Sequence, residues 1–280
     1  MRNSKCLVFD HTVCDLGEGA IWLESCQSFA WLDILSRQVY EKSLAGPLRR
    51  YRLSFTATAI LPPENADLAK LRLVADNGVY ELDLESGGLL LLSEISLPSS
   101  HRTNDAGIDP DGRIVFGVME WQPTGLHGWI SRIEKNGQHV KLIEQVGIAN
   151  TITWSECGQV MYYADSFKQV MYAVNYSGLS VVEFYSLANT LATPDGSCEY
   201  GGCLYTAEWD GWRIAKRCMQ SGQLLAELLV PAPRPTSCAI YNDRILITTA
   251  RTELSEVELK AAPDSGKTFV AKLNDFVDIA

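Results

Sequence analysis

The segment Met161-Tyr162-Tyr163-Ala164-Asp165 decides the fold, because similar segments recur along the chain. Each copy is a short apolar run rich in residues that favour β-strands. The copies end at Asp33, Asp76, Met119, Asp165, Glu208 and Arg251. These positions are separated by 43, 43, 46, 43 and 43 residues. A nearly constant period over most of a chain is the signature of a repeat architecture.

A second strand-like segment follows several copies, for example Gln38-Val39-Tyr40 and Gly78-Val79-Tyr80. Turn signals separate the segments, and no long helical periodicity competes with them. Each unit therefore reads as an antiparallel meander of about four strands, which must stack on its neighbours to bury both faces. Six such units predict an all-β, six-bladed β-propeller that forms a single domain over residues 1–280. A β-sandwich or barrel with accidental spacing is the alternative.

The composition excludes several classes of protein. Hydrophobic residues make up 46% and charged residues 21% of the 280 residues, which is typical of a globular chain rather than a disordered one. The formal net charge of -10 argues against a nucleic-acid partner. No apolar run approaches the roughly 18 residues that span a bilayer, so no membrane partner is expected. The N-terminus does not resemble a signal peptide, which predicts a cytoplasmic protein.

The eight cysteines and four histidines are scattered. No Cys-x-x-Cys, His-x-His or His-Glu-x-x-His pattern occurs, so zinc-ribbon, thioredoxin-like and His-rich metal sites are not expected. We expect free, mostly buried thiols. A metal held by carboxylates and amides remains open.

Four polar segments stand at expected strand entries, next to Gly or Pro. They are the segment 16–22 with Glu18, Arg102-Thr103-Asn104-Asp105, the segment 147–154 with Asn150, and Thr193-Pro194-Asp195-Gly196. Taken singly, each is ordinary turn chemistry. Together they supply two carboxylates and an amide oxygen from three different blades, an oxygen-rich set suited to Ca²⁺, Mg²⁺ or Mn²⁺ and compatible with Zn²⁺ or Fe²⁺.

The chain resembles the gluconolactonase/regucalcin (senescence marker protein) family of sugar lactonases. Several long motifs carry the resemblance in order along nearly the whole chain. They include LGEGAIW at 16–22, RTNDAGIDPDGRIVFGVM at 102–119, IANTITWSECGQVMYYADS at 148–166 and TPDGSCEYGGCLYTAEWDGWRI at 193–214. The resemblance implies a six-bladed propeller, in agreement with the repeat count, and one divalent cation in its central channel.

The resemblance also assigns roles to residues. The family's metal ligands fall on Glu18, Asn150 and Asp195, and its catalytic acid/base falls on Asp195 as well. Its substrate-binding Arg and Asn fall on Arg102 and Asn104.

Three positions depart from the family pattern or leave the register open. Thr151 stands where Gly usually follows the metal-binding Asn, and a β-branched residue would be strained there if the backbone needs a positive φ. Ala106 replaces a common Gly after Asp105. A further acidic substrate contact falls near Glu120 or Gln122, and we assign it to Glu120.

These features predict metal-dependent hydrolysis of a sugar lactone to its sugar acid. The cation would polarise the lactone carbonyl, and no Gly-x-Ser-x-Gly elbow suggests an acyl-enzyme instead. The alternatives are a non-catalytic propeller that binds a metabolite or a protein, and a hydrolase of other lactones or of phosphotriesters at the same site. A calcium-handling role comes last. The sequence leaves the sugar, the metal (Ca, Zn, Mn, Mg or Fe(II)) and the oligomeric state open.

Overall fold

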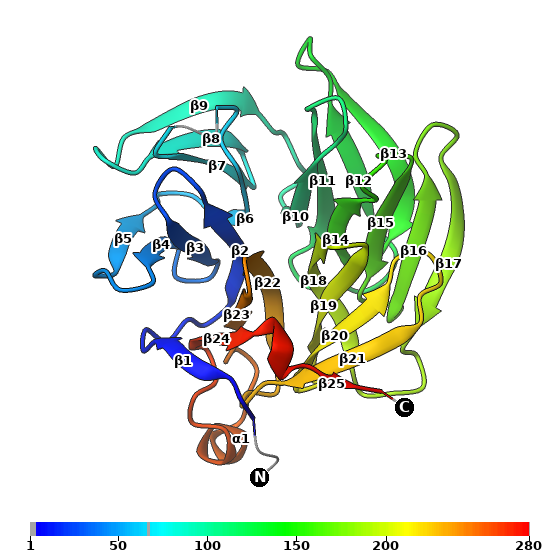
Figure 1. Cartoon of the computed structure of the whole chain (residues 1–280). Coiled ribbons are helices and arrows are strands. Elements are labelled where there is room, and N and C mark those ends of the chain that lie inside the picture. The colour runs from blue at the N-terminus through cyan, green and yellow to red at the C-terminus, as the bar shows by residue number, and fades with distance from the viewer. Residues whose placement is uncertain (1–3, 66–67, 280) are drawn as a thin grey trace. The chain divides into compact units, whose positions relative to one another are not determined.

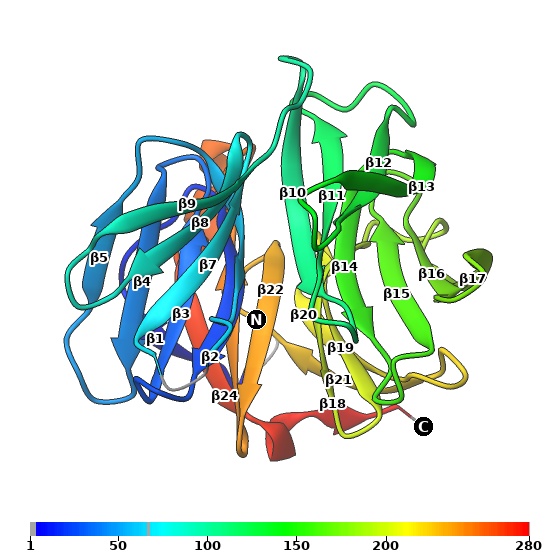
Figure 2. The same ribbon diagram turned by 90° about the horizontal axis from the view of Figure 1, so that it is seen from above.

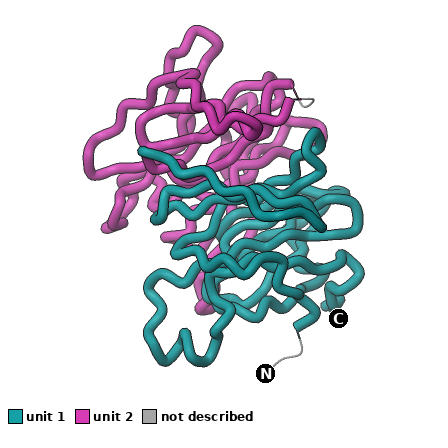
Figure 3. The backbone as a smooth tube through the Cα atoms, turned by 90° about the vertical axis from the view of Figure 1, so that its left-hand side faces the viewer, with its two compact units in different colours: residues 1–54, 195–280 teal, residues 55–194 magenta. Residues whose placement is uncertain are grey.

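The computed structural model describes residues 4–65 and 68–279. Its strands form six antiparallel sheets, five with four strands and one with five (Figures 1 and 2). Within each sheet, successive strands of the meander are hydrogen-bonded neighbours. The chain separates into two compact units, residues 55–194 and residues 1–54 with 195–280 (Figure 3). Each unit contains three sheets. The number of sheets and their meander order confirm the predicted all-β, six-bladed propeller class, whereas the single-domain boundary stays a prediction.

The unit formed by residues 55–194 holds three consecutive meanders. The first consists of β6 (Ala57–Leu61), β7 (Lys70–Ala75), β8 (Gly78–Asp83) and β9 (Leu89–Glu94). The second consists of β10 (His101–Ile108), β11 (Ile114–Glu120), β12 (Gly128–Ile133) and β13 (His139–Val146). The third consists of β14 (Ala149–Trp154), β15 (Val160–Asp165), β16 (Val170–Asn175) and β17 (Ser180–Ser186).

The other unit combines both ends of the chain. Its first sheet consists of β2 (Gly17–Leu23), β3 (Ser28–Asp33), β4 (Gln38–Ser43) and β5 (Arg49–Arg52). Its second consists of β18 (Thr193–Tyr200), β19 (Cys203–Trp209), β20 (Arg213–Cys218), β21 (Leu224–Leu229) and the short β25 (Val277–Asp278). In its third sheet, β22 (Pro235–Tyr241), β23 (Arg244–Thr249) and β24 (Thr268–Lys272) are completed by the N-terminal strand β1 (Leu7–Asp10).

The repeated segment of the sequence is the second strand of each sheet. β3 is buried along its whole length, and β7, β15 and β23 are buried at all but their first residue. Two of the fourth strands, β9 and β17, are instead largely exposed. The second strands were recognisable because continuous apolar runs are the pattern of strands buried on both faces.

The carboxylate that ends the repeat has a structural role. Asp33 accepts backbone N–H bonds from Asp15 (3.0 Å) and Leu16 (3.2 Å), just before β2. Asp165 likewise accepts from Gly147 (3.1 Å) and Ile148 (3.2 Å), just before β14. In both sheets, the carboxylate that ends the second strand therefore fixes where the first strand begins. The polar candidate of the first strand follows one or two residues later.

The apolar core lies between neighbouring sheets. In residues 55–194, Val115 and Ile130 pack in one cluster with Met161 and Val174 of the next sheet. A second cluster in the other unit is built on Phe29 and Trp31, which are fully buried. Burying a large apolar side chain stabilises by about 1.5–3 kcal/mol, so these inter-sheet clusters supply the stacking that a single meander lacks.

Two short helical segments were not predicted. The helix α1 (Glu256–Ala261) begins after Ser255, whose hydroxyl accepts from the Glu258 N–H, while the Glu258 carboxylate accepts from the Ser255 N–H. This Ser-x-x-Glu capping box was present in the sequence as a signal. The second is the 3₁₀ turn η1 (Leu273–Asp275).

All eight cysteines are free thiols, as predicted. Only Cys6, Cys14 and Cys238 are buried, so the expectation of mostly buried thiols was too strong; Cys157 is exposed and the other four are intermediate. Among residues 4–65 and 68–279, no helix has the length and apolar character needed to cross a membrane.

Candidate active site

The candidate residues of β2, β10 and β14 lie at irregularities of these first strands. The pairing register shifts at the same stage of each strand, between Glu18 and Ile21, between Thr103 and Ala106, and between Asn150 and Thr153. A β-bulge redirects side chains that would otherwise alternate across the sheet. The repeat therefore places a bulge beside Glu18, Asn104 and Asn150.

In the unit that contains both chain ends, Glu18 and Asp195 are carried by strands that flank β22. The Thr236 hydroxyl of β22 donates to the Gly17 carbonyl at 2.5 Å, and Gly196 lies against the Thr236 carbonyl. A Cβ atom at position 196 would come within 2.8 Å of that carbonyl oxygen. Thr236 thus contacts the residue before one carboxylate and the residue after the other.

The glycines beside Glu18 have separate reasons. A Cβ atom at Gly17 would approach the Thr249 carbonyl oxygen to 2.7 Å, so only glycine lets β2 pack this closely on β23. Gly19 has a φ of +61°, which side chains other than glycine adopt reluctantly. Together these glycines let β2 approach its neighbour and turn at Glu18. The side chain of Glu18 is partly buried, and that of Asp195 is 6% exposed.

In residues 55–194, the candidates form one continuous chain of hydrogen bonds. Arg102 donates to Asn104 Oδ1 (2.7 Å), and Asn104 Nδ2 donates to Asn150 Oδ1 (2.7 Å). Asn150 Nδ2 donates to Ser166 Oγ (2.8 Å), which donates to the Pro194 carbonyl (2.6 Å). The structure therefore brings together Arg102, Asn104 and Asn150, which lie on two adjacent sheets.

Arg102 is held by further contacts. Its side chain is 9% exposed, donates to the Thr103 carbonyl at 3.0 Å, and lies over the ring of Trp121 with 5.7 Å between the guanidinium carbon and the ring centroid. A cation over an indole face is attracted by the ring. Trp121 was not identified from the sequence, although it lies one residue beyond β11.

Glu120 is engaged by its own loop. Its carboxylate accepts from the Thr124 N–H (2.9 Å) and hydroxyl (3.0 Å) and lies 3.1 Å from His127 Nδ1. The Thr124 backbone bond, followed by the contact with His127, lowers the pKa of Glu120 to about 2. Gln122, the other residue considered, is exposed. The assignment of Glu120 to substrate stays a prediction.

Thr151 has the positive φ that the sequence left open. Its φ is +52° and its side chain is fully buried. For a β-branched residue this conformation costs on the order of 1–3 kcal/mol, so the surroundings must impose it. The carboxylate of Asp105, on the adjacent strand β10, accepts the backbone N–H groups of Thr151 and Ile152, as well as that of Ala106 at 2.7 Å.

Asp105 is an unexpected participant. Burial raises its pKa to about 6, even though its three backbone donors act in the opposite direction. The sequence marked Asp105 only as part of a turn-like segment, because its partners lie on another strand. The turn after Asn150 is therefore supported from the sheet that carries Arg102 and Asn104.

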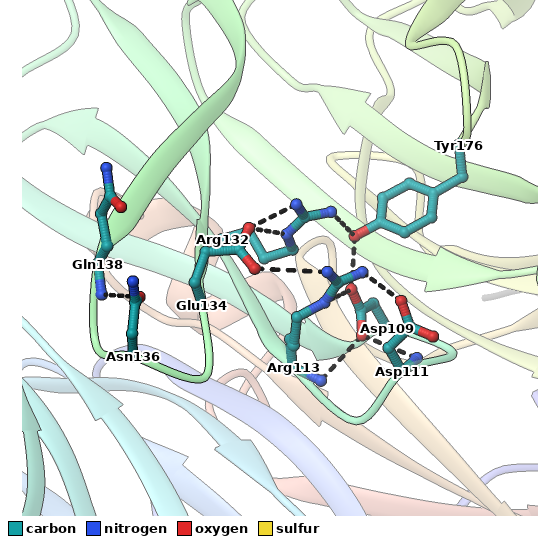
Figure 4. A network of polar contacts seen from close by, with 8 residues as sticks. All are labelled: Asp109, Asp111, Arg113, Arg132, Glu134, Asn136, Gln138 and Tyr176. Carbon is teal, nitrogen blue, oxygen red and sulfur yellow. Dashed lines mark hydrogen bonds and ion pairs between the residues drawn. The ribbon is translucent and has the colours of Figure 1, made fainter.

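Figure 4 shows a different polar cluster, which contains none of these candidates. Arg113 donates to Asp109 (2.8 Å), Asp111 (2.5 Å) and Glu134 (3.4 Å), and the Tyr176 hydroxyl donates to Asp109 (2.8 Å). A surface pocket is lined by Asp111, Arg113, Glu134, Lys135 and Asn136. Because the guanidinium is already matched by carboxylates and Tyr176 joins the next sheet, this cluster reads as structural.

The three residues that the resemblance assigns as metal ligands all carry oxygen donors. Within the described parts of the chain, no three His, Cys, Asp or Glu side chains are grouped so that they could hold a metal. The candidate ligands are the carboxylates of Glu18 and Asp195 and the amide oxygen of Asn150. Such ligands suit hard cations such as Ca²⁺. The amide oxygen of Asn150 has a defined orientation, because Asn104 donates to it.

Comparisons with known proteins give relatives along nearly the whole chain. An L-arabinolactonase from Azospirillum brasilense is 27% identical over 267 residues, covering 92% of this chain and 88% of the relative. Regucalcin from Danio rerio is 26% identical over 269 residues, covering 91% and 90%. The crystal structure of a calcium-binding regucalcin from Agrobacterium tumefaciens superposes with a TM-score of 0.87 at 28% identity, covering 95% and 93%.

A model of the SMP-30/gluconolactonase/LRE-like region matches residues 16–251. The match begins just before Glu18 and ends at Arg251, so it includes every candidate residue and all six copies of the repeat. The chain therefore belongs to the SMP-30/gluconolactonase/LRE-like family.

Proposed function

We propose that this protein hydrolyses a sugar lactone to the corresponding sugar acid. The observation that carries the proposal is the series of hydrogen bonds from Arg102 through Asn104 to Asn150 in this protein. The protein belongs to the SMP-30/gluconolactonase/LRE-like family, and an L-arabinolactonase is among its relatives. The groups in this series are a guanidinium and two amides, which are suited to binding hydroxyl and ester oxygens. The substrate class is an aldonolactone, with gluconate, galactonate, arabinonate and xylonate lactones as candidates.

Glu18, Asn150 and Asp195 would hold one divalent cation. When bound, such an ion supplies a Lewis acid for an ester carbonyl. The calcium-binding description of the Agrobacterium tumefaciens regucalcin makes Ca²⁺ the first ion to test. The donor chemistry is equally compatible with Mg²⁺ or Mn²⁺, and Zn²⁺ and Fe²⁺ complete the test set.

The protein's own residues provide binding and proton transfer. Arg102 and Asn104 would orient the sugar hydroxyls and the ring ester, which lowers the entropic part of the barrier. The Asp195 carboxylate would take a proton from the attacking water and return it to the departing ring oxygen. Glu120 would contact the substrate or hold the loop beside it.

A pH-stat assay over the four lactones tests the proposal. We expect turnover of at least one lactone, loss of activity after chelation, and recovery with one of the five ions. Glu18→Gln should weaken cation binding and lower activity together, whereas Asp111→Asn in the separate cluster serves as the control. Full activity in the metal-stripped protein would refute the cation assignment. A protein that binds lactones without turnover, or prefers a phosphotriester, would refute the proposed reaction.

A further inference from the structure

Ser166 is the least expected member of the hydrogen-bond chain. It follows β15 directly, and its N–H donates to the Ile148 carbonyl at 2.9 Å. The preceding residue, Asp165, binds the N–H groups of Gly147 and Ile148. These contacts fix the backbone of Ser166 beside the start of β14, and its side chain is buried. Its hydroxyl consequently has a defined position next to Asn150.

The first and last groups of this series of hydrogen bonds determine the direction of every bond in it. A guanidinium such as Arg102 can only donate, and a peptide carbonyl such as that of Pro194 can only accept. Asn104 must therefore turn its oxygen to Arg102 and its NH₂ to Asn150. Asn150 must then turn its oxygen to Asn104 and its NH₂ to the serine hydroxyl. One orientation of the two amides satisfies all four bonds.

A flipped Asn150 would break this pattern at both sides. Its NH₂ would face the NH₂ of Asn104, and its oxygen would compete with the Pro194 carbonyl for the single proton of Ser166. Two hydrogen bonds between buried or partly buried groups would be lost, each with a net contribution of about 0.5–1.5 kcal/mol. The hydroxyl of Ser166 is the part of this pattern that can be removed without changing Arg102, Asn104 or Asn150.

We infer that Ser166 is a positioning residue for the cation site. Its hydroxyl holds the Asn150 amide so that the oxygen, and not the NH₂ group, is oriented toward Asn104 and offered to the cation. It also ties Asn150 to the carbonyl of Pro194, the residue that precedes Asp195 in the chain. The inference rests on the proposed function, because it assumes that Asn150 is a ligand.

The test compares Ser166→Ala, Ser166→Thr and the control Ser177→Ala, an exposed serine in the turn between β16 and β17. Calorimetric titration of the metal-stripped protein with Ca²⁺ and Mn²⁺ measures affinity without reference to turnover. Loss of a partner that orients a ligand lowers metal affinity by roughly 10–100-fold, and we expect an effect in this range for Ser166→Ala. Ser166→Thr keeps the hydroxyl and should bind within about threefold of the wild type, an expectation based on the same orientation argument.

A second readout follows the amide itself. In the metal-free protein, the NMR signals of the Asn150 NH₂ protons should lose protection from exchange in Ser166→Ala and keep it in Ser166→Thr. Thermal melting without metal checks that the variants are folded.

Two results would overturn the inference, and they can be told apart. Unchanged cation affinity in folded Ser166→Ala overturns this inference alone, and the proposed lactonase function stands if Asp195→Asn is inactive. Lactone hydrolysis by a wild-type protein that binds no cation overturns the metal assignment of the proposed function and this inference with it.

Discussion

The two compact units position their candidate residues in different ways. In the unit with both chain ends, Glu18 and Asp195 are placed by close packing of Gly17 and Gly196 against neighbouring strands. In residues 55–194, Asn104 and Asn150 are placed by a directed chain of side-chain hydrogen bonds. The chemistry of the groups explains the contrast. The two oxygens of a carboxylate are equivalent, so the location of the strand matters most, whereas an amide must also be turned the right way.

Asp195→Asn is the strongest test of this comparison, because it replaces a carboxylate, whose two oxygens are equivalent, with an unsymmetric amide. We expect kcat for lactone hydrolysis to fall at least about 10³-fold, within the range associated with losing an acid/base group. Stability should change little, since volume and backbone are preserved. Steady-state kinetics and denaturant unfolding measure the two effects, with Asp111→Asn as the matched control. A loss of less than tenfold would remove Asp195 from the proton-transfer role.

Thr236→Val tests whether packing against β22 places the carboxylates. The substitution preserves the side-chain shape but removes the hydroxyl that donates to the Gly17 carbonyl. We expect kcat/KM to fall about tenfold, as when a residue that supports a ligand is lost, and the free energy of unfolding to fall by about 1 kcal/mol.

The matched control for this variant is Thr268→Val, in the same sheet. The Thr268 hydroxyl is buried and has no hydrogen-bond partner among the residues that the structure describes, so its removal should leave activity unchanged and stability equal or higher. If both variants lost the same activity, a valine in this sheet, and not the lost bond to Gly17, would be the cause.

The sequence predicted the parts of the structure that are local, and it missed those that depend on pairing between strands. The second strands were recognisable because runs such as Phe29-Ala30-Trp31-Leu32 are apolar throughout and recur at a fixed interval. The polar residues at the strand entries were recognisable from their neighbours. Ser166 and Asp105 could not be assigned, because their partners lie on other strands and the registers that bring them together leave no local pattern.

The family resemblance contributed roles that residue patterns alone could not. The residue pattern alone suggested that the Asn150 amide could join an oxygen-rich cation set, and the resemblance assigned Asn150 as a metal ligand. The resemblance also exposed Thr151 as a departure, and the structure shows the positive φ there. It did not resolve the position of the acidic substrate contact, because the loop after β11 had no fixed register in the sequence.

Thr151→Gly measures the strain stored in the unit of residues 55–194. Glycine removes the conformational penalty at φ +52° but also the buried side chain. The comparison variant is Thr103→Gly, which removes an equally buried threonine whose φ is not positive, together with its hydroxyl contact with Thr58 at 2.7 Å. Both variants should lower the free energy of unfolding. The decrease caused by Thr151→Gly should be smaller than that caused by Thr103→Gly, by at least about 1 kcal/mol. Equal losses in denaturant unfolding would show that the turn after Asn150 carries no measurable strain.

Glu120→Gln should have the smallest effect, and its pH dependence separates a loop contact from a substrate contact. Because the pKa of Glu120 in the folded protein is lowered to about 2, its carboxylate stabilises the folded state fully above its unfolded pKa near 4.5. That contribution is lost as the pH falls through about 2. The difference in unfolding free energy between wild type and Glu120→Gln should therefore shrink as the pH falls below about 4.5. If the Glu120 carboxylate serves only Thr124 and His127, it adds little to substrate binding, and KM for the lactone should change less than about threefold. A tenfold rise in KM with kcat unchanged would instead establish Glu120 as a substrate contact. The residues that bind substrate would then include the end of β11 as well as β10.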